Sequence, residues 1–553
     1  MARADEPNVT VCWFRNDLRL HDNVIVHQAA QAVESGRSSA VLPIYCFDPL
    51  FFKHGKGGFP KTGAYRAQFL LESVLDLKAN LRAVGSDLLV CVGRPEEKIP
   101  DMLRELQAGG RPATVLAQTE VTSEELGTDR RLRAAMQGHG KLQLEWGSTM
   151  YHLQDLPYRG DLSDLKGAFT NFRVKVEEKS GVRDPLPAPK KGSLPLPSGM
   201  SAALLDFSPS PQELPGGHGY DSSVRAPADI WRGGETAALQ RLKYYLWDTD
   251  LIADYFNTRN GMLGGDYSTK FAPWLAHGCL SPRTIYAEIQ RYQAQRTKNK
   301  STYWVIFELI WRDFYKFFAL KHGNAIFFED GTEGRAPQWA PNQDELFERW
   351  RTGRTGMPLV DANMRELNAT GFMSNRGRQN VASYLVLDLG VDWRKGADYF
   401  ESLLIDYDCA SNWGNWVAAA GLTGGRLNKF NITKQSKDYD LEGTYLRHWI
   451  PELANVPASR IHEPWLMSKA EMDKYGVQIG EDYPQPPKKP ATAYYTGGGG
   501  GGRGDYRGGG GRGGPQRPGS ARGGGGRGGG GERRYSGKGG AARKPRGEFD
   551  RFG

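Results

Sequence analysis

The N-terminal part of the chain alternates between short apolar runs and longer amphipathic segments. Runs rich in β-branched and aromatic residues predict buried strands, and segments with an apolar position every three or four residues predict helices. The pattern predicts strands over residues 9–13, 40–47, 87–92 and 114–118, and helices over residues 24–34, 64–84 and 96–108. Strands that alternate with helices form parallel βαβ units, so residues 1–180 are predicted to form an α/β domain around a doubly wound parallel sheet. The first strand-to-helix turn lacks the GxGxxG motif, which argues against a dinucleotide site there.

A change of composition marks the end of this domain. Residues 181–228 are rich in Pro, Gly and Ser and have no helical period, which predicts an interdomain linker. Residues 229–490 show helical periodicity without strand signals, so we predict an all-α domain. Ser281 followed by Pro282 is typical of a helix start. The expected helices cover residues 235–247, 281–295, 303–322, 344–350 and 358–370.

The stretch 375–416 combines an apolar helical row with many polar side chains. Val381, Leu385 and Leu389 share that row, so the stretch should be buried. It also holds two arginines on one helix turn, two aspartates two residues apart, several asparagines and three tryptophans. Because an unpaired buried polar group costs about 1–3 kcal/mol, this cluster is predicted to hold a ligand.

Two other segments of the all-α region carry candidate chemistry. Residues 266–271 (DYSTKF) precede a helical segment, where hydroxyls, backbone N–H groups and a lysine can hold phosphate, although such residues can equally be an ordinary helix cap. Residues 303–322 form an aromatic-rich helix with Glu308 and Arg312 four residues apart. The simplest interpretation of that pair is an internal salt bridge.

Composition excludes several classes of protein. The chain has 553 residues, enough for two or three domains, and its five cysteines form no CxxC pair. A disulfide framework, a zinc site or another metal centre is therefore not indicated. No apolar run approaches the ~18–20 residues that span a bilayer, and no signal peptide is recognisable. We expect a soluble intracellular protein without membrane contact.

The net charge of +9 lies in the C-terminal tail, where residues 497–553 contain 13 Lys and Arg and 4 Asp and Glu. Gly/Arg repeats at Arg507, Arg512, Arg522 and Arg527 stand near Tyr506 and Tyr535. Such a segment cannot bury apolar surface, so residues 491–553 are predicted to be disordered. RGG tracts bind single-stranded nucleic acid by charge and stacking, which makes RNA or DNA contact the favoured role over a solubilising spacer.

Taken together, the motifs resemble those of the photolyase/cryptochrome flavoproteins, and specifically of the cryptochrome DASH group. The resemblance covers about residues 8–470 and leaves out the linker and the tail. The matching pieces are WFRNDLRLHDN from Trp13, TRNGMLGGDYSTKFAPWLAHGCLSPR from Thr258, TYWVIFELIWRDFYKFF from Thr302, TGMPLVDANMRELNATGFMSNRGRQNVASYL from Thr355 and DYDCASNWGNW from Asp406.

The resemblance implies that FAD binds folded into a U in the all-α domain. Arg378 and Asp406 match an ion pair beside the isoalloxazine ring, Asp408 matches the acceptor for the ring edge, and Asn412 matches the residue that faces flavin N5. The residues implied near the phosphates are Tyr255, Ser268, Thr269, Lys270, Phe271 and Ala272.

Electron transfer and substrate binding follow from the same resemblance. Trp416, Trp393 and Trp339 match the tryptophan chain that passes electrons from the surface to photoexcited flavin. Glu308 matches the carboxyl that binds the bases of a pyrimidine dimer, and Trp311 matches a stacking face for a flipped lesion. The rest of the implied pocket comprises Asn375, Arg376 and Gln379.

Three positions qualify the match. Gln379 is typical of the DASH group, and the absence of His there argues against (6-4) chemistry. Ala418 stands two residues past Trp416, where members of the family usually have a second aromatic residue that clamps the lesion. Glu120 matches the pterin-binding glutamate, which implies 5,10-methenyltetrahydrofolate as an antenna on the α/β domain.

The sequence therefore predicts a photolyase-type lyase that uses blue light and reduced FAD to split cyclobutane pyrimidine dimers by electron transfer, preferentially in single-stranded DNA. Such catalysis depends on positioning and redox tuning. Two alternatives stay open: a blue-light photoreceptor with little repair, and an RNA- or single-strand-binding regulator that acts through the RGG tail. We expect a monomer in the cytoplasm or nucleus, with an organelle as a further option.

Overall fold

The computed structural model describes residues 8–106, 113–138, 140–216, 231–335, 337–425 and 427–487. These residues belong to one compact unit. The tail, for which the sequence predicts disorder and nucleic-acid contact, lies outside the described residues.

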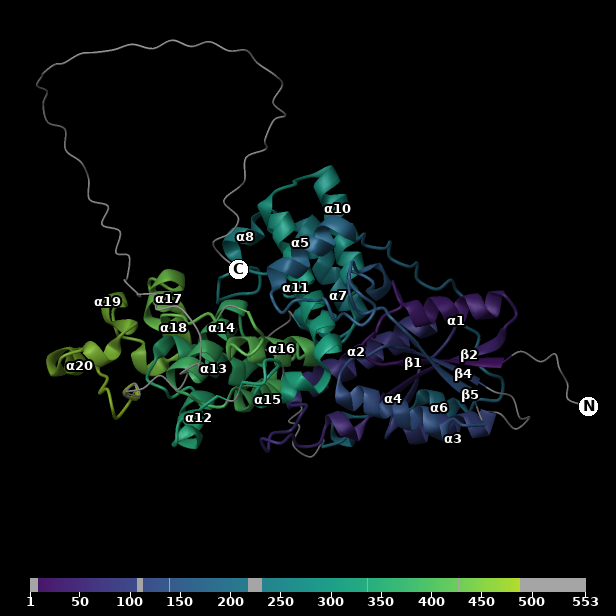
Figure 1. Cartoon of the computed structure of the whole chain (residues 1–553), viewed down its shortest axis with the longest axis horizontal. Helices are drawn as coiled ribbons and strands as arrows, with labels where there is room; N and C mark the ends of the chain where they lie inside the picture. Colours follow the sequence, from purple (N-terminus) through teal and green to yellow (C-terminus); the bar gives the residue numbers. More distant parts are fainter. Residues whose placement is uncertain are drawn as a thin grey trace, which may run out of the picture. The chain divides into compact units, whose positions relative to one another are not determined.

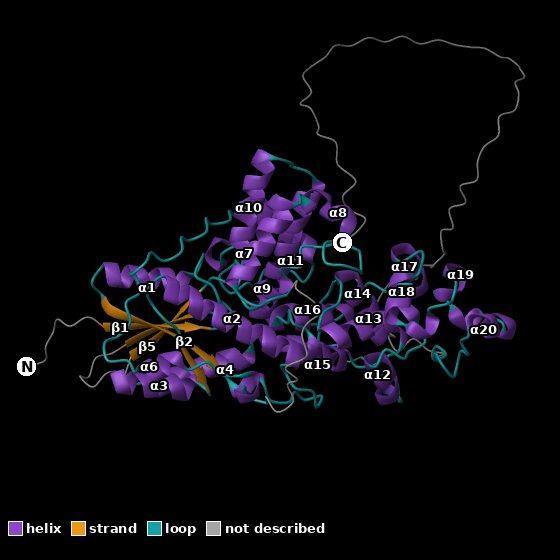
Figure 2. Cartoon of the chain, turned by 180° about the vertical axis from the view of Figure 1, so that it is seen from behind, coloured by secondary structure: helices purple, strands orange, loops and turns teal. Residues whose placement is uncertain are grey.

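A five-stranded parallel sheet forms the centre of the N-terminal domain (Figure 2). Its strands are β1 Asn8–Phe14, β2 Ser38–Phe47, β3 Leu89–Val92, β4 Ala113–Gln118 and β5 Gly140–Glu145. Their order in the sheet is β3-β2-β1-β4-β5, so the chain winds first to one side of β1 and then to the other. The predicted doubly wound parallel sheet is thereby confirmed.

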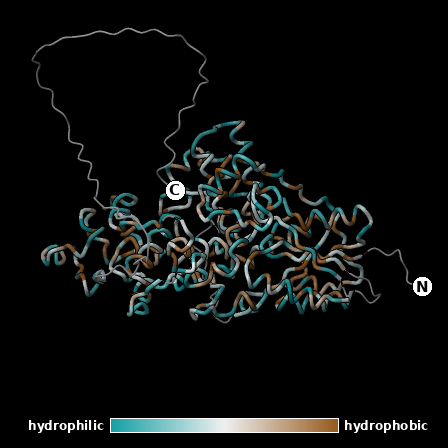
Figure 3. Tube along the Cα trace, viewed as in Figure 1, coloured by the Kyte–Doolittle hydropathy of each residue, from teal (hydrophilic) through white to brown (hydrophobic). Residues whose placement is uncertain are grey.

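Alternate strand residues face opposite layers of helices. One face packs on α1 Val24–Glu34 and α2 Ala64–Ala83, and the other packs on α3 Pro95–Leu106 and α4 Ser123–Ala135. Figure 2 shows the strands between these layers, and Figure 3 shows the hydrophobic runs of the strands inside the domain. The sequence pattern missed α4, whose surface is strongly charged, and β5, an edge strand of alternating polar and apolar residues.

The remainder of the described chain is helical. After α5 Phe169–Lys179 and the short α6 Ala202–Asp206, helix α7 begins at Glu235. No β-strand occurs in the described residues from 231 to 487. The further helices are α8 Tyr255–Thr258, α9 Ala272–Ala276, α10 Pro282–Gln295, α11 Lys300–His322, α12 Gln343–Arg351, α13 Pro358–Thr370, α14 Asn375–Ser383, α15 Trp393–Leu403, α16 Cys409–Ala419, α17 Ile432–Tyr439, α18 Thr444–Trp449, α19 Ala458–Ile461 and α20 Lys469–Tyr475.

Two predicted helices change their winding before they end. α7 ends at Lys243 and continues as the π-helix Tyr244–Asp248, and α14 continues as the π-helix Tyr384–Asp388. The row Val381, Leu385 and Leu389 is buried as expected. The wider π turn of Tyr384–Asp388 lies between the predicted site residues of α14 and those of α15. Such turns are frequently found at functional sites.

The two domains share one hydrophobic core, because the α1/α2 face of the sheet is continuous with the interior of the helical domain. Buried charges reinforce this contact: Arg283 of α10 pairs with Asp22 at 2.5 Å. The carboxylate of Asp313 in α11 accepts the backbone N–H groups of Met150 at 3.0 Å and Tyr151 at 2.8 Å. Figure 1 shows α10, α11 and α7 beside the end of the sheet domain. Within the part of the chain that the structure describes, every helix is too short or too polar to span a bilayer.

Candidate functional site

Arg241 of α7 fixes the loop that carries the predicted phosphate-binding residues. Its guanidinium donates to the carbonyl oxygens of Gly265 at 2.9 Å, Ser268 at 3.2 Å and Thr269 at 3.0 Å. It also pairs with Asp266 at 3.0 Å. Four contacts from one side chain hold the loop backbone in a single shape just before α9. Sequence patterns could not predict this role of Arg241, because the partner groups lie about 25 residues away.

Lys270 is a buried cation that forms no ion pair among the described residues. It is 4% exposed, and its ammonium lies 3.5 Å from the centroid of the Tyr267 ring and 4.4 Å from that of Phe372. Burial lowers the pKa of Lys270 to about 7, and the nearby Glu366 carboxylate offsets only part of that effect. A buried charge is costly unless it is paired, so Lys270 is suited to a bound phosphate.

Arg378 and Asp406 form the expected ion pair, with 2.8 Å between Nη2 and Oδ2. Arg378 Nε also donates to the carbonyl oxygen of Met373 at 2.9 Å, which fixes the guanidinium. The second carboxylate oxygen, Asp406 Oδ1, is buried and has no hydrogen-bond partner among the described residues, and the same holds for the Tyr267 hydroxyl. Unpaired groups of this kind cost about 1–3 kcal/mol each. They therefore present an acceptor and a donor to a ligand.

Glu366 of α13 lies next to this cluster and was not predicted. Its Oε2 accepts the hydroxyl of Tyr445 at 2.6 Å. Burial raises the pKa of Glu366 to about 7, while the Tyr445 hydrogen bond and the charges of Lys270 and Arg378 lower it. The cluster thus contains two groups, Glu366 and Lys270, that change charge near neutral pH.

Asp408 and Asn412 lie on the first turn of α16. Asp408 is the N-cap, and its carboxylate accepts a backbone N–H of the first turn at 2.7 Å. Burial raises the pKa of Asp408, but the positive charges of Lys316 and Arg312 outweigh it and lower the pKa overall. The Asn412 amide donates to the carbonyl oxygen of Ala397 at 3.0 Å and is 8% exposed. Both side chains are therefore held in fixed orientations.

These residues fit FAD. The cluster offers a buried cation for phosphate, a free carboxylate oxygen beside an arginine, and a fixed amide on α16. Tyr255 and Phe271 are buried at 7% and 2% exposure, and Ala272 begins α9. These side chains can bind a phosphate, the hydrogen-bond donors at the edge of a ring, and an apolar ring system.

Of the three predicted electron-transfer tryptophans, two are buried and the third is partly exposed. Trp416 is 3% exposed, Trp393 is fully buried and Trp339 is partly exposed. Trp416 lies against α15, since a Cβ placed on Gly396 would be 2.3 Å from its ring. Trp393 begins the same helix, and its Nε1 donates to the carbonyl oxygen of Glu329 at 3.2 Å. The Glu329 carboxylate in turn accepts Trp339 Nε1 at 2.8 Å, so Glu329 connects the two indoles.

The expected salt bridge within α11 is wrong. Glu308 pairs with Arg259 at 3.2 Å instead of with Arg312. Arg312 donates to the carbonyl oxygens of Ser148 at 2.5 Å and Leu275 at 3.1 Å. The reason is that an i,i+4 pair on a helix contributes only a few tenths of a kcal/mol, whereas carbonyl oxygens buried at the domain contact need a donor.

The predicted substrate residues Asn375, Arg376 and Gln379 lie in the first two turns of α14. Arg376 donates to Gln379 Oε1 at 2.8 Å and to Asn260 Oδ1 at 3.1 Å, and it lies 4.7 Å from the ring of Tyr439. Asn375 and Gln379 are exposed. Because Asn260 follows Arg259, the partner of Glu308, residues 259–260 link the predicted substrate residues of α11 and α14.

One face of Trp311 is already covered. The Phe169 ring lies parallel to it with 3.6 Å between the ring centroids and 7° between the planes. Ala418 is half-buried on α16 and supplies no ring. The lesion clamp that the resemblance implies thus lacks one aromatic residue, and Phe169 occupies a face of the other.

The predicted antenna residue Glu120 lies at the contact between the domains. Its Oε2 accepts Lys316 of α11 at 2.5 Å, and its Oε1 accepts the amides of Asn16 and Gln118, each at 3.3 Å. Burial raises the pKa of Glu120, but Lys316 and Arg15 outweigh it and lower the pKa overall. Both oxygens are bound within the protein.

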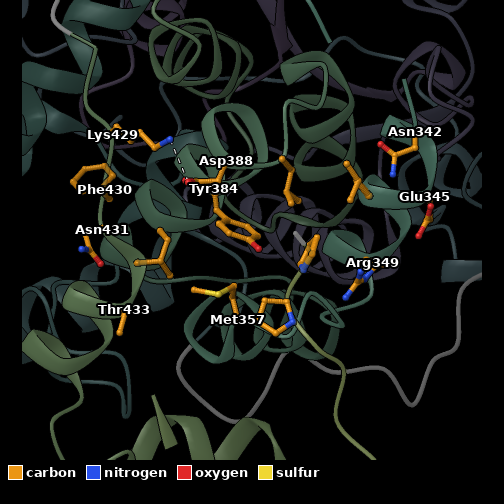
Figure 4. A pocket seen from close by; sticks show the side chains of 15 residues that line it. Asn342, Glu345, Arg349, Met357, Tyr384, Asp388, Lys429, Phe430, Asn431 and Thr433 are labelled. Carbon is orange, nitrogen blue, oxygen red and sulfur yellow. Dashed lines mark ion pairs between the residues drawn. The ribbon is translucent and has the colours of Figure 1, made fainter. Parts of the chain in front are cut away.

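A cavity of about 760 Å³ lies between α12, the π-helix Tyr384–Asp388 and residues 429–433. Figure 4 shows Tyr384 and Arg349 at this cavity and the ion pair between Lys429 and Asp388, 3.2 Å apart, at its edge. None of the predicted cofactor or substrate residues lines it.

Comparison with known proteins agrees with this geometry. Residues 10–190 match the family model described as DNA photolyase, and residues 304–494 match the FAD binding domain of DNA photolyase. Cryptochrome DASH, chloroplastic/mitochondrial, of Ostreococcus tauri is 51% identical over 84% of this chain and 88% of its own length. Cryptochrome DASH of Synechocystis sp. is 49% identical over 87% of this chain and 95% of its own length.

Solved structures agree as well. The crystal structure of a Synechocystis sp. PCC6803 cryptochrome has a TM-score of 0.78 at 47% identity and covers 87% of this chain and 96% of its own. A class III photolyase from Agrobacterium tumefaciens has a TM-score of 0.71 at 26% identity over 88% of this chain and 95% of its own. An α/β domain joined to a helical FAD-binding domain defines the photolyase-type flavoproteins. Within that class, the chain belongs to the cryptochrome DASH family.

Proposed function

We propose that this chain splits cyclobutane pyrimidine dimers in single-stranded DNA under blue light. The observation that carries the proposal is the link between Glu308 and Arg376 through residues 259–260. This link places a carboxylate and a guanidinium near the exposed amides of Asn375 and Gln379, which lie on the same helix as Arg376. Such donors and acceptors suit the edges of bases that have left the stack.

FAD, when bound, supplies the electron that opens the cyclobutane ring. The electron then returns to FAD. In our proposal Ser268, Thr269 and Lys270 hold its phosphates, with Tyr255, Phe271 and Ala272 beside them. Arg378, Asp406 and Asp408 orient the ring edge, and Asn412 provides a neutral amide next to it. The buried, unpaired Lys270 ammonium and Asp406 Oδ1 support these assignments.

Trp339, Trp393 and Trp416 are proposed to deliver electrons from the surface to the flavin. Trp339 is partly exposed, Trp393 and Trp416 are buried, and Glu329 contacts both Trp339 and Trp393, which supports a path from the surface to the interior. Glu120 is proposed to bind 5,10-methenyltetrahydrofolate, which requires the pterin to replace or share its contacts with Lys316, Asn16 and Gln118. The absorption spectrum of the purified full chain tests this antenna assignment.

The test of repair uses the flavin-loaded full chain with a dimer-bearing oligonucleotide, single-stranded and duplex, under blue light. We expect faster repair of the single strand and none in the dark. Residues 1–495, which contain the described compact unit, should retain the repair activity. If neither oligonucleotide is repaired by either form, the enzyme proposal fails.

A second function, light sensing with little repair, is favoured by the covered face of Trp311 and by Ala418. It predicts full flavin photoreduction together with negligible repair. A Phe169→Ala variant distinguishes the two functions, because uncovering Trp311 should raise dimer affinity only if the ring contacts the lesion.

The Gly/Arg tail is proposed to add affinity for single-stranded nucleic acid, RNA included. The compartment also remains a proposal: some relatives carry "chloroplastic/mitochondrial" in their names and others do not. Imaging of the tagged full chain distinguishes cytoplasm, nucleus and organelle.

A further inference from the structure

A fourth tryptophan contacts the middle of the proposed electron-transfer chain. Trp413 lies on α16 directly after Asn412, and its ring centroid is 5.8 Å from that of Trp393 at an angle of 78°. It is half-buried and also lies 5.1 Å from the ring of Phe327. None of the roles proposed above uses Trp413.

Trp413 donates its indole N–H to a carboxylate. The distance from Trp413 Nε1 to Glu401 Oε2 is 3.2 Å. Glu401 belongs to α15, is 6% exposed, and has Lys61 of the N-terminal domain 3.7 Å from its other oxygen. Burial raises the pKa of Glu401, against the lowering effect of Lys61 and Arg66. The carboxylate is therefore a stronger proton acceptor than an exposed glutamate.

Trp393 has no such acceptor. Its indole N–H donates to the backbone carbonyl oxygen of Glu329, which cannot take up a proton. An indole that has lost an electron becomes a much stronger acid at its N–H group. The oxidised state is consequently more stable at an indole whose proton can move to a carboxylate than at Trp393.

We propose that Trp413 and Glu401 form a proton-coupled branch of the electron-transfer chain. Trp393, once oxidised by way of Trp416 and the photoexcited flavin, receives one electron from Trp413. The Trp413 Nε1 proton moves to Glu401 Oε2. Trp393 is thereby restored, Trp413 becomes a neutral radical and Glu401 a neutral acid, so charge and atoms balance.

The branch has a specific consequence for the lifetime of the light-induced state. Return of the electron from the flavin to Trp413 requires return of the proton from Glu401, which slows recombination. Trp339 and the Glu329 carboxylate form a similar indole–carboxylate pair near the surface, where the Glu329 side chain is 45% exposed. The buried branch would hold the oxidising equivalent inside the protein, and the surface branch would pass it to an external reductant.

This inference rests on the proposed flavin photoreduction and is tested on the flavin-loaded full chain. The variants are Glu401→Gln, which retains a hydrogen-bond acceptor but no proton acceptor, Trp413→Phe, and Trp449→Phe as the matched control outside the chain. Light-minus-dark infrared spectra should show a new protonated-carboxyl band in the wild type and the control, and none in Glu401→Gln or Trp413→Phe. Transient absorption should show a several-fold shorter lifetime of the light-induced state in both variants. Thermal melts of the flavin-free proteins show whether each variant is folded.

Two results overturn the inference, and they can be told apart. If Trp393→Phe abolishes photoreduction while Glu401→Gln and Trp413→Phe match the wild type in band and lifetime, the branch alone is wrong. If Trp393→Phe photoreduces like the wild type, the branch falls together with the chain on which it rests. A double variant, Trp339→Phe with Trp413→Phe, should lose more photoreduction than either single variant.

Discussion

At the scale of single residues, Lys270 shows how a cofactor site can be recognised by the folding stability that a buried charge costs the protein. Its ammonium is buried among aromatic rings, and burial lowers its pKa from 10.5 to about 7. A shift of one pKa unit corresponds to about 1.4 kcal/mol. The flavin-free protein therefore loses stability, on the order of 3–5 kcal/mol, by burying this charge at neutral pH.

We predict that Lys270→Met stabilises the flavin-free protein and weakens FAD binding. Between about pH 7 and pH 10.5 the unfolded state binds more protons at residue 270 than the folded state does, so wild-type stability rises with pH. The advantage of the variant should thus be greatest below pH 7 and vanish toward pH 10.5. Urea unfolding over this range measures it, and FAD titration measures the affinity.

Lys437→Met is the matched control, because the Lys437 side chain is 47% exposed and pairs with Glu463 at the surface. It should leave both the pH dependence and FAD affinity unchanged. A Lys270→Met variant that is less stable than the wild type without FAD would contradict the interpretation of Lys270 as an unpaired buried charge.

Gly377 illustrates a residue that is required for its size. A Cβ at this position would lie 1.9 Å from Asn363 Oδ1 and 2.8 Å from Met373 Cγ. Gly377→Ala should therefore push α14 away from α13 and destabilise the fold by about 1–3 kcal/mol. Because Arg378 is the next residue, FAD should also be released at a lower temperature. Calorimetry with and without FAD checks both effects, and Gly160→Ala, whose Cβ would meet nothing within 4 Å, should be close to neutral.

At the scale of elements, α11 connects the α/β domain to the site. Asp313 holds the backbone of residues 150–151, Lys316 binds Glu120, and Glu308 pairs with Arg259. A displacement of this helix would move the interdomain contact and the predicted substrate residues together. The helix therefore couples the position of the α/β domain to that of the predicted substrate residues.

Removal of the Asp313 carboxylate should weaken this connection. Asp313→Ala leaves the buried N–H groups of Met150 and Tyr151 unpaired, at a cost of about 1–3 kcal/mol each. We expect a lower unfolding midpoint in urea and a reduced yield of flavin-loaded protein. Asp344→Ala is the control: its side chain is 87% exposed, so loss of its pair with Lys395 should change stability by less than about 1 kcal/mol.

At the scale of the whole molecule, the charge is divided between a neutral body and a basic tail. Residues 497–553 hold 13 of the 72 Lys and Arg but only 4 of the 63 Asp and Glu. Each phosphate that the tail neutralises adds about 0.7 to the salt slope of single-strand binding. The full chain should therefore show a steeper dependence of log K on log salt than residues 1–495 do.

A tail with every Arg replaced by Lys is the matched control for this measurement. It should keep the salt slope, because charge is retained, and bind more weakly if guanidinium stacking contributes. Equal slopes for the full chain and for residues 1–495 would show that the tail does not contact the nucleic acid. Fluorescence anisotropy with a labelled single strand at several salt concentrations measures the slope.

The amino-acid sequence alone was enough to predict the local architecture and the family. Strand and helix patterns depend on neighbours within a few residues, so β1 to β4 and the main helices were predicted closely. The ordered motifs indicated the family and led to the Arg378–Asp406 pair, which the structure contains. The sequence pattern did not predict α4 or β5. Helix α4 is rich in charged residues, and the edge strand β5 alternates between polar and apolar residues, so neither has a long apolar run.

The side chains that meet across long stretches of chain could be identified only in the folded protein. Glu308 pairs with Arg259 and not with its helical neighbour, Phe169 covers Trp311 from a helix about 140 residues earlier, and Trp413 contacts Trp393. Local periodicity states which face of an element is buried but not which partner it meets. The partner is set by competition among many buried groups for hydrogen bonds and space, and that competition is settled only when the helices pack.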